Sequence, residues 1–379
     1  MRIAAKSIIL LAFLAALACQ GSAFAATEGA DEEQIGRQAD REIEARMGFY
    51  KDGPLQEYVA RVGRRVLAQV QQPEFEFHFK VVDDEMVNAF ALPGGYVYIT
   101  RGMLAALSDE AELAGVLGHE IGHVINHHSV KQMNKSIGQA LLALTGMVLS
   151  QDIRNNAGAW LTVTATLGQQ ILSGYGREYE MESDQVGLIL AYSAGYDPSA
   201  IVSFLKTMQV IEKLGFQTYH SFMATHPDTI SRIVDAEAKS GLLQARGEAK
   251  QRYRDRYMEK IKGLTYGKPR WRGKTLPPYE LVVHEVKEGE TFRSISADVA
   301  GDLGRAFEVA SINGMEITEP LTPGMKVKVI VPARNVDIQL VPEEEKKYEV
   351  GVRIGDGKVG QNGGGSGQKA DGGSTSADR

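Results

Sequence analysis

The chain has 379 residues and a formal net charge of −6, with 43% hydrophobic and 24% charged residues. This length allows one large domain and a small one, and the composition is that of an ordinary soluble globular protein. The mild excess of acids is spread along the chain and leaves no basic footprint, so we expect no nucleic-acid partner.

The first 25 residues have the pattern of a secretory signal peptide. Arg2 and Lys6 precede a compact apolar run over residues 8–18, and Ala23-Phe24-Ala25 is a small-x-small cleavage site. The apolar run is too short for a comfortable membrane-spanning helix. We therefore predict a periplasmic protein whose mature chain begins near Ala26.

Cys19 leaves an alternative open. It follows Ala-Leu-Ala at 16–18, a poor bacterial lipoprotein box in which Leu stands one place too late. Lipidation there would make the protein an outer-membrane lipoprotein. If cleavage follows Ala25, the mature chain has no cysteine, and disulfides and thiol catalysis are excluded.

The catalytic domain is predicted over residues 26–262. Residues 31–72 read as helices, because apolar side chains recur at helical spacing and three arginines stand between them: Arg61, Arg64 and Arg65. The alternation from Phe75 to Val81 predicts a half-buried strand. Pro93-Gly94-Gly95 predicts a turn, and residues 96–99 a second strand.

A helix is expected next, capped by Ser108 or Asp109 and running to about residue 130. Residues 137–150 and 157–172 are apolar, and we interpret them as core or lid helices, with a membrane hairpin as the alternative. Helical patterning then resumes in three further stretches: 177–194, 201–214 and 230–262.

Three segments follow this domain. Residues 263–279 have the composition of a linker, residues 280–335 form a small segment, and residues 336–379 are expected to be a disordered tail rich in Gly and Ser.

His119-Glu120-Ile121-Gly122-His123 lies inside the predicted helix. Residues four apart share a helix face, so both imidazoles can bind one zinc ion, which favours nitrogen ligands at about 2.0–2.1 Å. Glu120 is rotated off that face by about 100°, where it can act as the general base on a water molecule activated by the metal. The alternative to a zinc site is that this pentapeptide occurs by chance on an exposed helix.

A catalytic zinc site needs a third protein ligand and one open position. Residues 177–184 supply candidates, and spacing alone does not choose between Glu178, Glu180 and Glu182. His127 and His128 are expected to extend the same helix away from the metal. If residues 177–184 are helical, Glu180 and Asp184 share a face.

Three ordered segments resemble the BepA/HtpX-type zinc metallopeptidases of peptidase family M48: Asn-Ala-Phe-Ala-Leu-Pro-Gly-Gly at 88–95, the His-Glu-x-x-His run, and residues 177–184. The resemblance implies an α+β fold with a mostly helical, gluzincin-type zincin domain and a small β-sheet. It also implies one zinc ion per chain, Glu180 as third ligand, and Asp184 as a partner of a ligand histidine and sometimes-named proton donor. Ser183 departs from the usual Ala.

The resemblance gives roles to two further segments. Asn88, Ala89 and Phe90 look like an edge strand that binds extended substrate through its backbone, the alternative being an ordinary hairpin strand. His226, in a Thr-His-Pro segment followed by Arg232, can reach the metal's open position or stabilise the tetrahedral intermediate. Its alternative is a loop-capping histidine.

Residues 280–335 contain Gly289-Glu290-Thr291-Phe292, Asn313-Gly314 and Pro323-Gly324. These runs resemble a LysM domain, although the first is usually Gly-Asp-Thr-Leu. The resemblance implies a small βααβ fold and a ligand, N-acetylglucosamine in peptidoglycan. The alternative is a small packing or protein-docking module.

The function expected from these features is an exported zinc endopeptidase that acts on misfolded or unassembled envelope proteins. The reaction follows from the site residues, and the substrate class follows only from the resemblance. One alternative is a periplasmic chaperone or scaffold for outer-membrane protein assembly with a largely closed protease site. Another is a wall-binding module with a vestigial peptidase.

Overall fold

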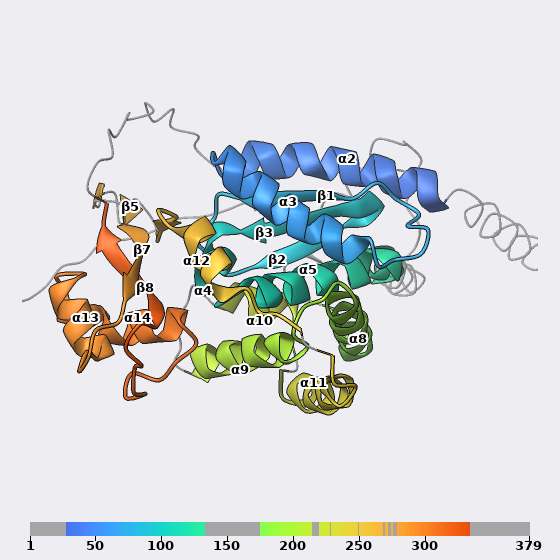
Figure 1. Ribbon diagram of the computed structural model, residues 1–379. Helices are drawn as coiled ribbons and strands as arrows, with labels where there is room; N and C mark the ends of the chain where they lie inside the picture. Colours follow the sequence, from blue (N-terminus) through green and yellow to red (C-terminus); the bar gives the residue numbers. More distant parts are fainter. Residues whose placement is uncertain are drawn as a thin grey trace, which may run out of the picture. The chain divides into compact units, whose positions relative to one another are not determined.

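The structure is a computed structural model that describes residues 28–132, 175–213, 220–227, 229–248, 250–267, 270–271, 274–275 and 279–333. The predicted signal peptide, Cys19, the two apolar segments within 133–174 and the predicted tail lie outside these residues. The fold described below is mostly helical with small sheets (Figure 1).

A three-stranded sheet forms the centre of the catalytic part. It contains β1 (His78–Val82), β2 (Ala89–Leu92) and β3 (Tyr96–Thr100) in the order β1-β3-β2. β1 runs parallel to β3, whereas β2 is antiparallel to it across the predicted Pro-Gly-Gly turn. Gly94 and Gly95 have φ of 73° and 90°, which explains why glycines occupy this turn. The first strand begins at His78 rather than at Phe75, because pairing with β3 starts there.

The two faces of this sheet pack against different helices (Figure 1). Val81, Ala91 and Ile99 face the main core together with α3 (Gly53–Leu67). Phe90 and Tyr98 face the opposite way, toward α2 (Glu28–Arg46), where the Tyr98 hydroxyl donates to Asp40 at 2.7 Å. This alternation is the period-two pattern of a strand covered on both sides.

Helix α5 (Glu110–Ile125) carries the His-Glu-x-x-His run and follows the short helix α4 (Arg101–Ala106). Asp109, one of the two predicted caps, accepts a hydrogen bond from the Glu112 amide at 2.9 Å. Asp109, Glu110 and Glu112 are buried in the first turn, and we call them the acidic cap of α5.

Small residues let α5 approach α8 (Arg177–Ser193) closely. A Cβ placed on Gly118 would lie 3.0 Å from Cα of Gly187, and one on Gly122 would lie 3.1 Å from Cα of Ser183. The two glycines therefore permit the close packing of α5 against α8. Ser183 itself is buried at this contact, which accommodates a small side chain.

α5 ends at Ile125, and the prediction that it continues to about residue 130 was wrong. Asn126 closes the helix, and His127 adopts a left-handed conformation with φ of 53°. Asn and His are among the residues that tolerate this conformation best. The reversal brings His128 back toward the helix instead of away from it.

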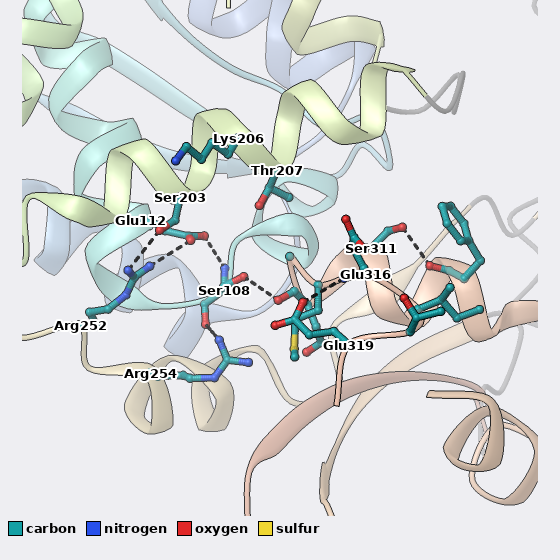
Figure 2. Close-up of a pocket in the computed structure, with 16 residues that line it drawn as sticks. Ser108, Glu112, Ser203, Lys206, Thr207, Arg252, Arg254, Ser311, Glu316 and Glu319 are labelled. Carbon is teal, nitrogen blue, oxygen red and sulfur yellow. Dashed lines mark hydrogen bonds and ion pairs between the residues drawn. The ribbon is translucent and has the colours of Figure 1, made fainter. Parts of the chain in front are cut away.

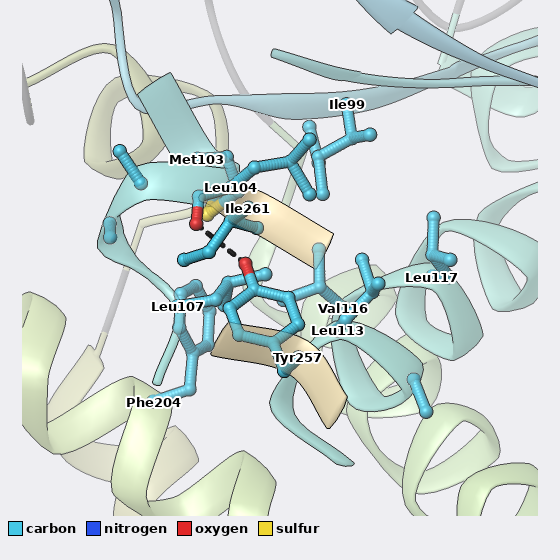
Figure 3. Packing of buried hydrophobic residues seen from close by; sticks show 14 of the residues in the cluster. Ile99, Met103, Leu104, Leu107, Leu113, Val116, Leu117, Phe204, Tyr257 and Ile261 are labelled. Carbon is cyan, nitrogen blue, oxygen red and sulfur yellow. Dashed lines mark hydrogen bonds between the residues drawn. The ribbon is translucent and has the colours of Figure 1, made fainter. Parts of the chain in front are cut away.

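The remaining helices of the catalytic part surround this core: α9 (Ser199–Lys213), α10 (His220–Thr225), α11 (Thr229–Gln244) and α12 (Arg254–Ile261). α12 inserts the buried Tyr257 among Leu104, Leu113 and other apolar residues of the main core, and its hydroxyl donates to the Leu104 carbonyl at 2.5 Å (Figure 3). Within the described part of the chain, no helix is both long and apolar enough to cross a bilayer.

The C-terminal module has the predicted β-α-α-β order: β7 (Tyr279–Glu285), α13 (Phe292–Asp298), α14 (Ala306–Ile312) and β8 (Lys326–Pro332). β7 and β8 pair in antiparallel fashion. Part of the predicted linker is ordered into this sheet, since β4 (Thr265–Tyr266) pairs with β7. The short strands β5 (Arg270–Trp271) and β6 (Lys274–Thr275) form a hairpin.

Two cations connect this module to the loop before α5. The fully buried Lys328 donates to the carbonyls of Ala105 and Leu107 at 2.7 and 2.6 Å, which satisfies the C-terminal end of α4. Arg254 donates to the carbonyls of Ser108 and Lys326 at 3.1 and 3.3 Å. Beside these contacts, a cavity of about 660 Å³ lies between α9 and the loop at residues 313–319 (Figure 2).

Candidate metal centre

Four buried side chains meet beside α5 and could hold a metal ion. His119, His123, Glu180 and His226 offer ligand atoms that all lie within 4.8 Å of one another. We call these four side chains the donor cluster. All four are almost inaccessible to solvent.

Two members of the donor cluster come from one face of α5. Nε2 of His119 lies 3.0 Å from Nε2 of His123, as the spacing of four residues on a helix predicts. The close contact between Gly118 and Gly187 sets the distance between this face and α8, which carries the carboxylate.

Glu180 is the member of the acidic segment that enters the cluster. Its carboxylate oxygens lie 3.5 Å from Nε2 of both His119 and His123. Glu178 is exposed, and Glu182 lies behind His128 instead. Of the three glutamates that the spacing allows, Glu180 is therefore the one that is buried beside the two imidazoles.

Arg232 of α11 lies behind the cluster and connects two of the carboxylates. It pairs with Asp184 through Nε and Nη2 at 2.6 and 2.8 Å, and with Glu180 through Nη1 at 2.7 Å. Although burial opposes ionisation, Arg232 lowers the pKa of Asp184 to about 2. Asp184 Oδ1 also lies 2.9 Å from Nδ1 of His119, at ion-pair distance although not aligned as a hydrogen bond.

A second support lies behind His123. Its Nδ1 is 3.0 Å from Nδ1 of His128, whose Nε2 is 3.2 Å from Glu182. If Glu182 accepts the Nε2 proton, Nδ1 of His128 can accept the proton on Nδ1 of His123, which leaves the His123 Nε2 lone pair facing the cluster. Burial lowers the pKa of His123 well below its usual value, which favours the neutral ligand form.

Glu120 lies next to the cluster without joining it. Both of its carboxylate oxygens are buried and have no hydrogen-bond partner among the described residues, and Oε1 is 3.6 Å from Nε2 of His226. Burial raises the pKa of Glu120 above its usual value. Such an unsatisfied buried carboxylate is costly for folding alone.

His226 adds a fourth donor and connects the cluster to the edge strand. Its Nδ1 is 3.2 Å from Nε2 of His119 and 3.1 Å from Glu180, and its Nε2 is 3.3 Å from the Ala89 carbonyl. Burial alone would lower the pKa of His226, but the nearby carboxylates of Glu180 and Glu120 raise it.

The predicted substrate residues therefore lie beside the cluster. Asn88 accepts a hydrogen bond from Thr225 at 3.2 Å, immediately before His226. Phe90 turns its side chain to the other face of the sheet and stacks on Tyr98.

The donor set suits a divalent cation. Nε2 of His119 and Nε2 of His123 lie 3.0 Å apart beside the Glu180 carboxylate. Hydrogen bonds alone cannot give all of these atoms a partner at the same time. Nitrogen and carboxylate donors in a compact buried group are typical of a transition-metal or zinc site.

Three functional neighbours were missed by reasoning from the sequence. Arg232 was noticed only as part of a segment, without a role. His128 was placed on the wrong side because the helix was expected to continue; the Asn-His pair at 126–127 is the signal that could have revealed the break. The ring of Tyr175 stacks on that of His123 with their centres 3.9 Å apart, and no sequence pattern points to this residue.

Comparisons with known proteins are consistent with a metal centre at this position. Residues 54–240 match the model described as peptidase family M48. The beta-barrel assembly-enhancing protease of Yersinia pestis is 30% identical over 236 residues, which cover 59% of this chain and 47% of that protein. The same protease of Escherichia coli K12 is 28% identical, covering 62% of this chain and 48% of that protein.

A eukaryotic relative also matches. The mitochondrial metalloendopeptidase OMA1 of Arabidopsis thaliana is 32% identical over 148 residues, covering 39% of this chain and 28% of that protein. The chain spans about half the length of the two bacterial relatives it matches.

Proposed function

The chain is a metallopeptidase of family M48, of the BepA/HtpX type, and we propose that it is a zinc endopeptidase acting on unfolded or misassembled envelope proteins. The observation that carries the proposal is the donor cluster, in which two histidines of α5 meet Glu180 of α8. The envelope substrates are inferred from the names of the bacterial relatives.

In this proposal one zinc ion per chain is held by His119, His123 and Glu180. When bound, zinc polarises the scissile carbonyl and lowers the pKa of a water molecule. His128 and Asp184 orient the two imidazoles from behind, so that their Nε2 lone pairs point to one place.

Glu120 acts as the general base and later as the general acid. Its unpartnered oxygens are available to accept a proton from water and pass it to the leaving amine. The raised pKa of Glu120 makes its carboxylate a stronger base, which favours the first of these steps, the acceptance of the proton from water.

Asp184 acts as a positioning residue rather than as a proton donor. The pKa of about 2 and the two-point pairing with Arg232 keep it ionised, and its negative charge, 2.9 Å from Nδ1 of His119, favours a proton on that nitrogen and a lone pair on Nε2. This supports one of the two roles that the family resemblance implied.

β2 is the last strand in the order β1-β3-β2, and the edge that does not pair with β3 offers a place for extended substrate. Thr100 donates to the Asn88 carbonyl, and hydrogen-bonded pairs alternate along an antiparallel ladder, so Ala89 and Ala91 turn their backbone groups away from β3. A peptide added there pairs through its own backbone beside the cluster, which tolerates many sequences.

Metal analysis combined with a casein-cleavage assay on wild type and Glu120→Gln tests the proposal. We expect stoichiometric zinc in both proteins and cleavage by the wild type only. A correctly folded wild type that holds no stoichiometric metal, or that cleaves no unfolded protein, would remove the basis of the enzymatic proposal.

His226 favours a second candidate, a chaperone or scaffold whose protease site is largely closed. Its Nδ1 lies where it can complete the zinc ligands, and the whole cluster is buried. If His226 closes the site, His226→Ala raises casein cleavage while zinc remains bound. If it stabilises the transition state instead, the same substitution lowers turnover, and unchanged zinc affinity and turnover would exclude both roles.

We also propose a periplasmic location and a wall contact through the LysM-like module, both from the sequence patterns. Intact mass of the mature protein separates cleavage after Ala25 from lipidation at Cys19. Sedimentation of the full chain with purified peptidoglycan, competed by N-acetylglucosamine oligomers, tests the wall contact. Failure to sediment would overturn the anchoring without affecting the peptidase proposal.

A further inference from the structure

A second cavity, of about 340 Å³, lies at the opposite end of α5 from the donor cluster. Its wall combines three guanidinium groups with a single carboxylate, and it is lined by Arg61, Val62, Arg65, Glu110, Tyr196 and Arg256. Glu110 and His119 are nine residues apart, which is about 13 Å along a helix axis. The cavity is therefore separate from the metal centre.

The oxygens of the carboxylate in this cavity already have hydrogen-bond and ion-pair partners. Glu110 is buried and accepts hydrogen bonds from the hydroxyls of Tyr58 and Tyr196 at 2.9 and 2.8 Å. Arg256 binds both of its oxygens, with Nε 2.5 Å from Oε2. One positive charge thus neutralises one negative charge, and Glu110 has little capacity left for the other two arginines.

Arg61 and Arg65 have no carboxylate partner of this kind among the described residues. Arg65 donates from Nε to the Ala194 carbonyl at 2.9 Å and stacks 4.7 Å from the Tyr196 ring centre. The Arg61 guanidinium lies 5.7 Å from the Tyr58 ring centre. Within the part of the chain that the structure describes, no carboxylate lies at ion-pair distance from either group. By contrast, Arg64 on the same helix pairs with Glu57.

The tyrosines do not supply the missing negative charge. Burial raises the pKa of Tyr58 and of Tyr196 above the usual value, so both phenols are neutral at physiological pH. The lining of the cavity consequently carries two uncompensated positive charges in a chain whose net charge is −6.

We propose that Arg61 and Arg65, with Arg256 beside them, bind a phosphomonoester group in this cavity. A phosphomonoester carries close to two negative charges at neutral pH and offers three acceptor oxygens, which matches two guanidinium groups that lack a carboxylate partner among the described residues. A single carboxylate would neutralise only one of them. This site goes beyond the proposed peptidase function and does not depend on it.

The test is calorimetric titration of the full-length protein with inorganic phosphate at constant ionic strength. We expect saturable binding by the wild type and about a hundredfold weaker binding by the double variant Arg61→Gln, Arg65→Gln, because two charge-assisted hydrogen bonds are lost. Arg64→Gln is the matched control and should bind phosphate as the wild type does, since its side chain is already paired on the same helix.

Vesicles of phosphatidylcholine with and without phosphatidic acid separate the possible sources of the ligand. Arginine-dependent binding to phosphatidic acid vesicles as well as to phosphate indicates a lipid headgroup, and binding to phosphate alone indicates a soluble phosphorylated molecule. The proposal is overturned if wild type shows no saturable phosphate binding, or if the double variant binds as tightly as Arg64→Gln.

A folding defect must not be mistaken for loss of the site. Zinc content and casein cleavage of the same preparations should be unchanged, because the cavity is remote from the donor cluster. Should the double variant fail to fold, Arg61→Gln alone tests the proposal, since Arg61 is exposed and makes no hydrogen bond among the described residues. That variant is expected to bind phosphate about tenfold more weakly.

Discussion

The two ends of α5 bury charged side chains to a similar depth but balance them differently. In the acidic cap, Glu110 is paired with Arg256, and Arg252 pairs with the other two carboxylates at 2.6 and 3.2 Å. At the other end, three imidazoles surround one carboxylate, and Glu120 has no hydrogen-bond partner in the part of the chain that the structure describes.

This difference separates structure from function within one helix. The acidic cap is complete as it stands, with each carboxylate satisfied by cations, hydroxyls or amides, as folding requires. The donor cluster is incomplete without a cation. Its unsatisfied buried groups lower the stability of the folded protein when no metal is bound. Substitutions at the two ends should therefore differ in size and in their dependence on metal.

The largest expected effect is that of Arg232→Met. It leaves Glu180 and Asp184 buried without their cation, which we expect to lower the free energy of unfolding by roughly 3–5 kcal/mol. Urea unfolding of the metal-free protein measures this. The zinc affinity should fall as well, because Asp184 no longer orients His119.

Arg256→Met is the matched change at the acidic cap. Glu110 keeps the hydroxyls of Tyr58 and Tyr196, and the Arg256 side chain is 43% exposed, so we expect a loss of only about 1–2 kcal/mol. Equal losses for the two arginines would contradict the claim that the ends of α5 differ.

Addition of zinc should stabilise one end of α5 only. A ligand that binds the folded state at a thousandfold excess over its Kd adds about 4 kcal/mol to the free energy of unfolding. We expect this gain in the wild type and in Arg256→Met, measured by urea unfolding with and without zinc. His123→Ala should lose most of it, and a gain that survives this substitution would place the metal elsewhere.

The sequence predicts the parts of this arrangement that depend on local spacing. The meeting of His119 and His123 is predicted by their spacing of four residues on a helix, and the turn before β3 is predicted by two adjacent glycines. Glu180 could be selected only through the family resemblance, because three glutamates fit the spacing equally well. The positions of Arg232, which is 48 residues beyond Asp184, and of Lys328 depend on tertiary packing that no local pattern encodes.

Lys328 offers a smaller, pH-dependent test near the acidic cap. Burial and Arg254 lower its pKa to about 7, while Glu112 and Asp109 act in the opposite direction. Its value in an unfolded chain is about 10.4, so between pH 7 and 10 the unfolded state holds a proton that the folded state has released. Stability from this group therefore rises with pH across that window.

We expect the free energy of unfolding to rise by about 1–3 kcal/mol across this window. The upper limit is about 1.4 kcal/mol multiplied by the number of units by which the pKa differs between the two states, and the expected rise lies below it. Urea unfolding of wild type and Lys328→Met at pH 7 and pH 10 measures it as the difference between the two slopes. Lys326→Met, a neighbour that is 30% exposed, is the control and should retain the wild-type slope. A wild-type slope in Lys328→Met would show that another group titrates.

The smallest effect is expected for Arg64→Gln, and it tests whether burial, rather than pairing itself, makes the charges around α5 matter. Arg64 and Glu57 pair at 2.5 Å, as short a contact as those of the acidic cap, but their side chains are 54% and 63% exposed. Water screens such a pair and stabilises each partner when the other is removed, so we expect a change within about 0.5 kcal/mol in urea unfolding. A loss comparable to that of Arg256→Met would mean that contact distance outweighs burial, and the contrast between the two ends of α5 could then not be attributed to desolvation.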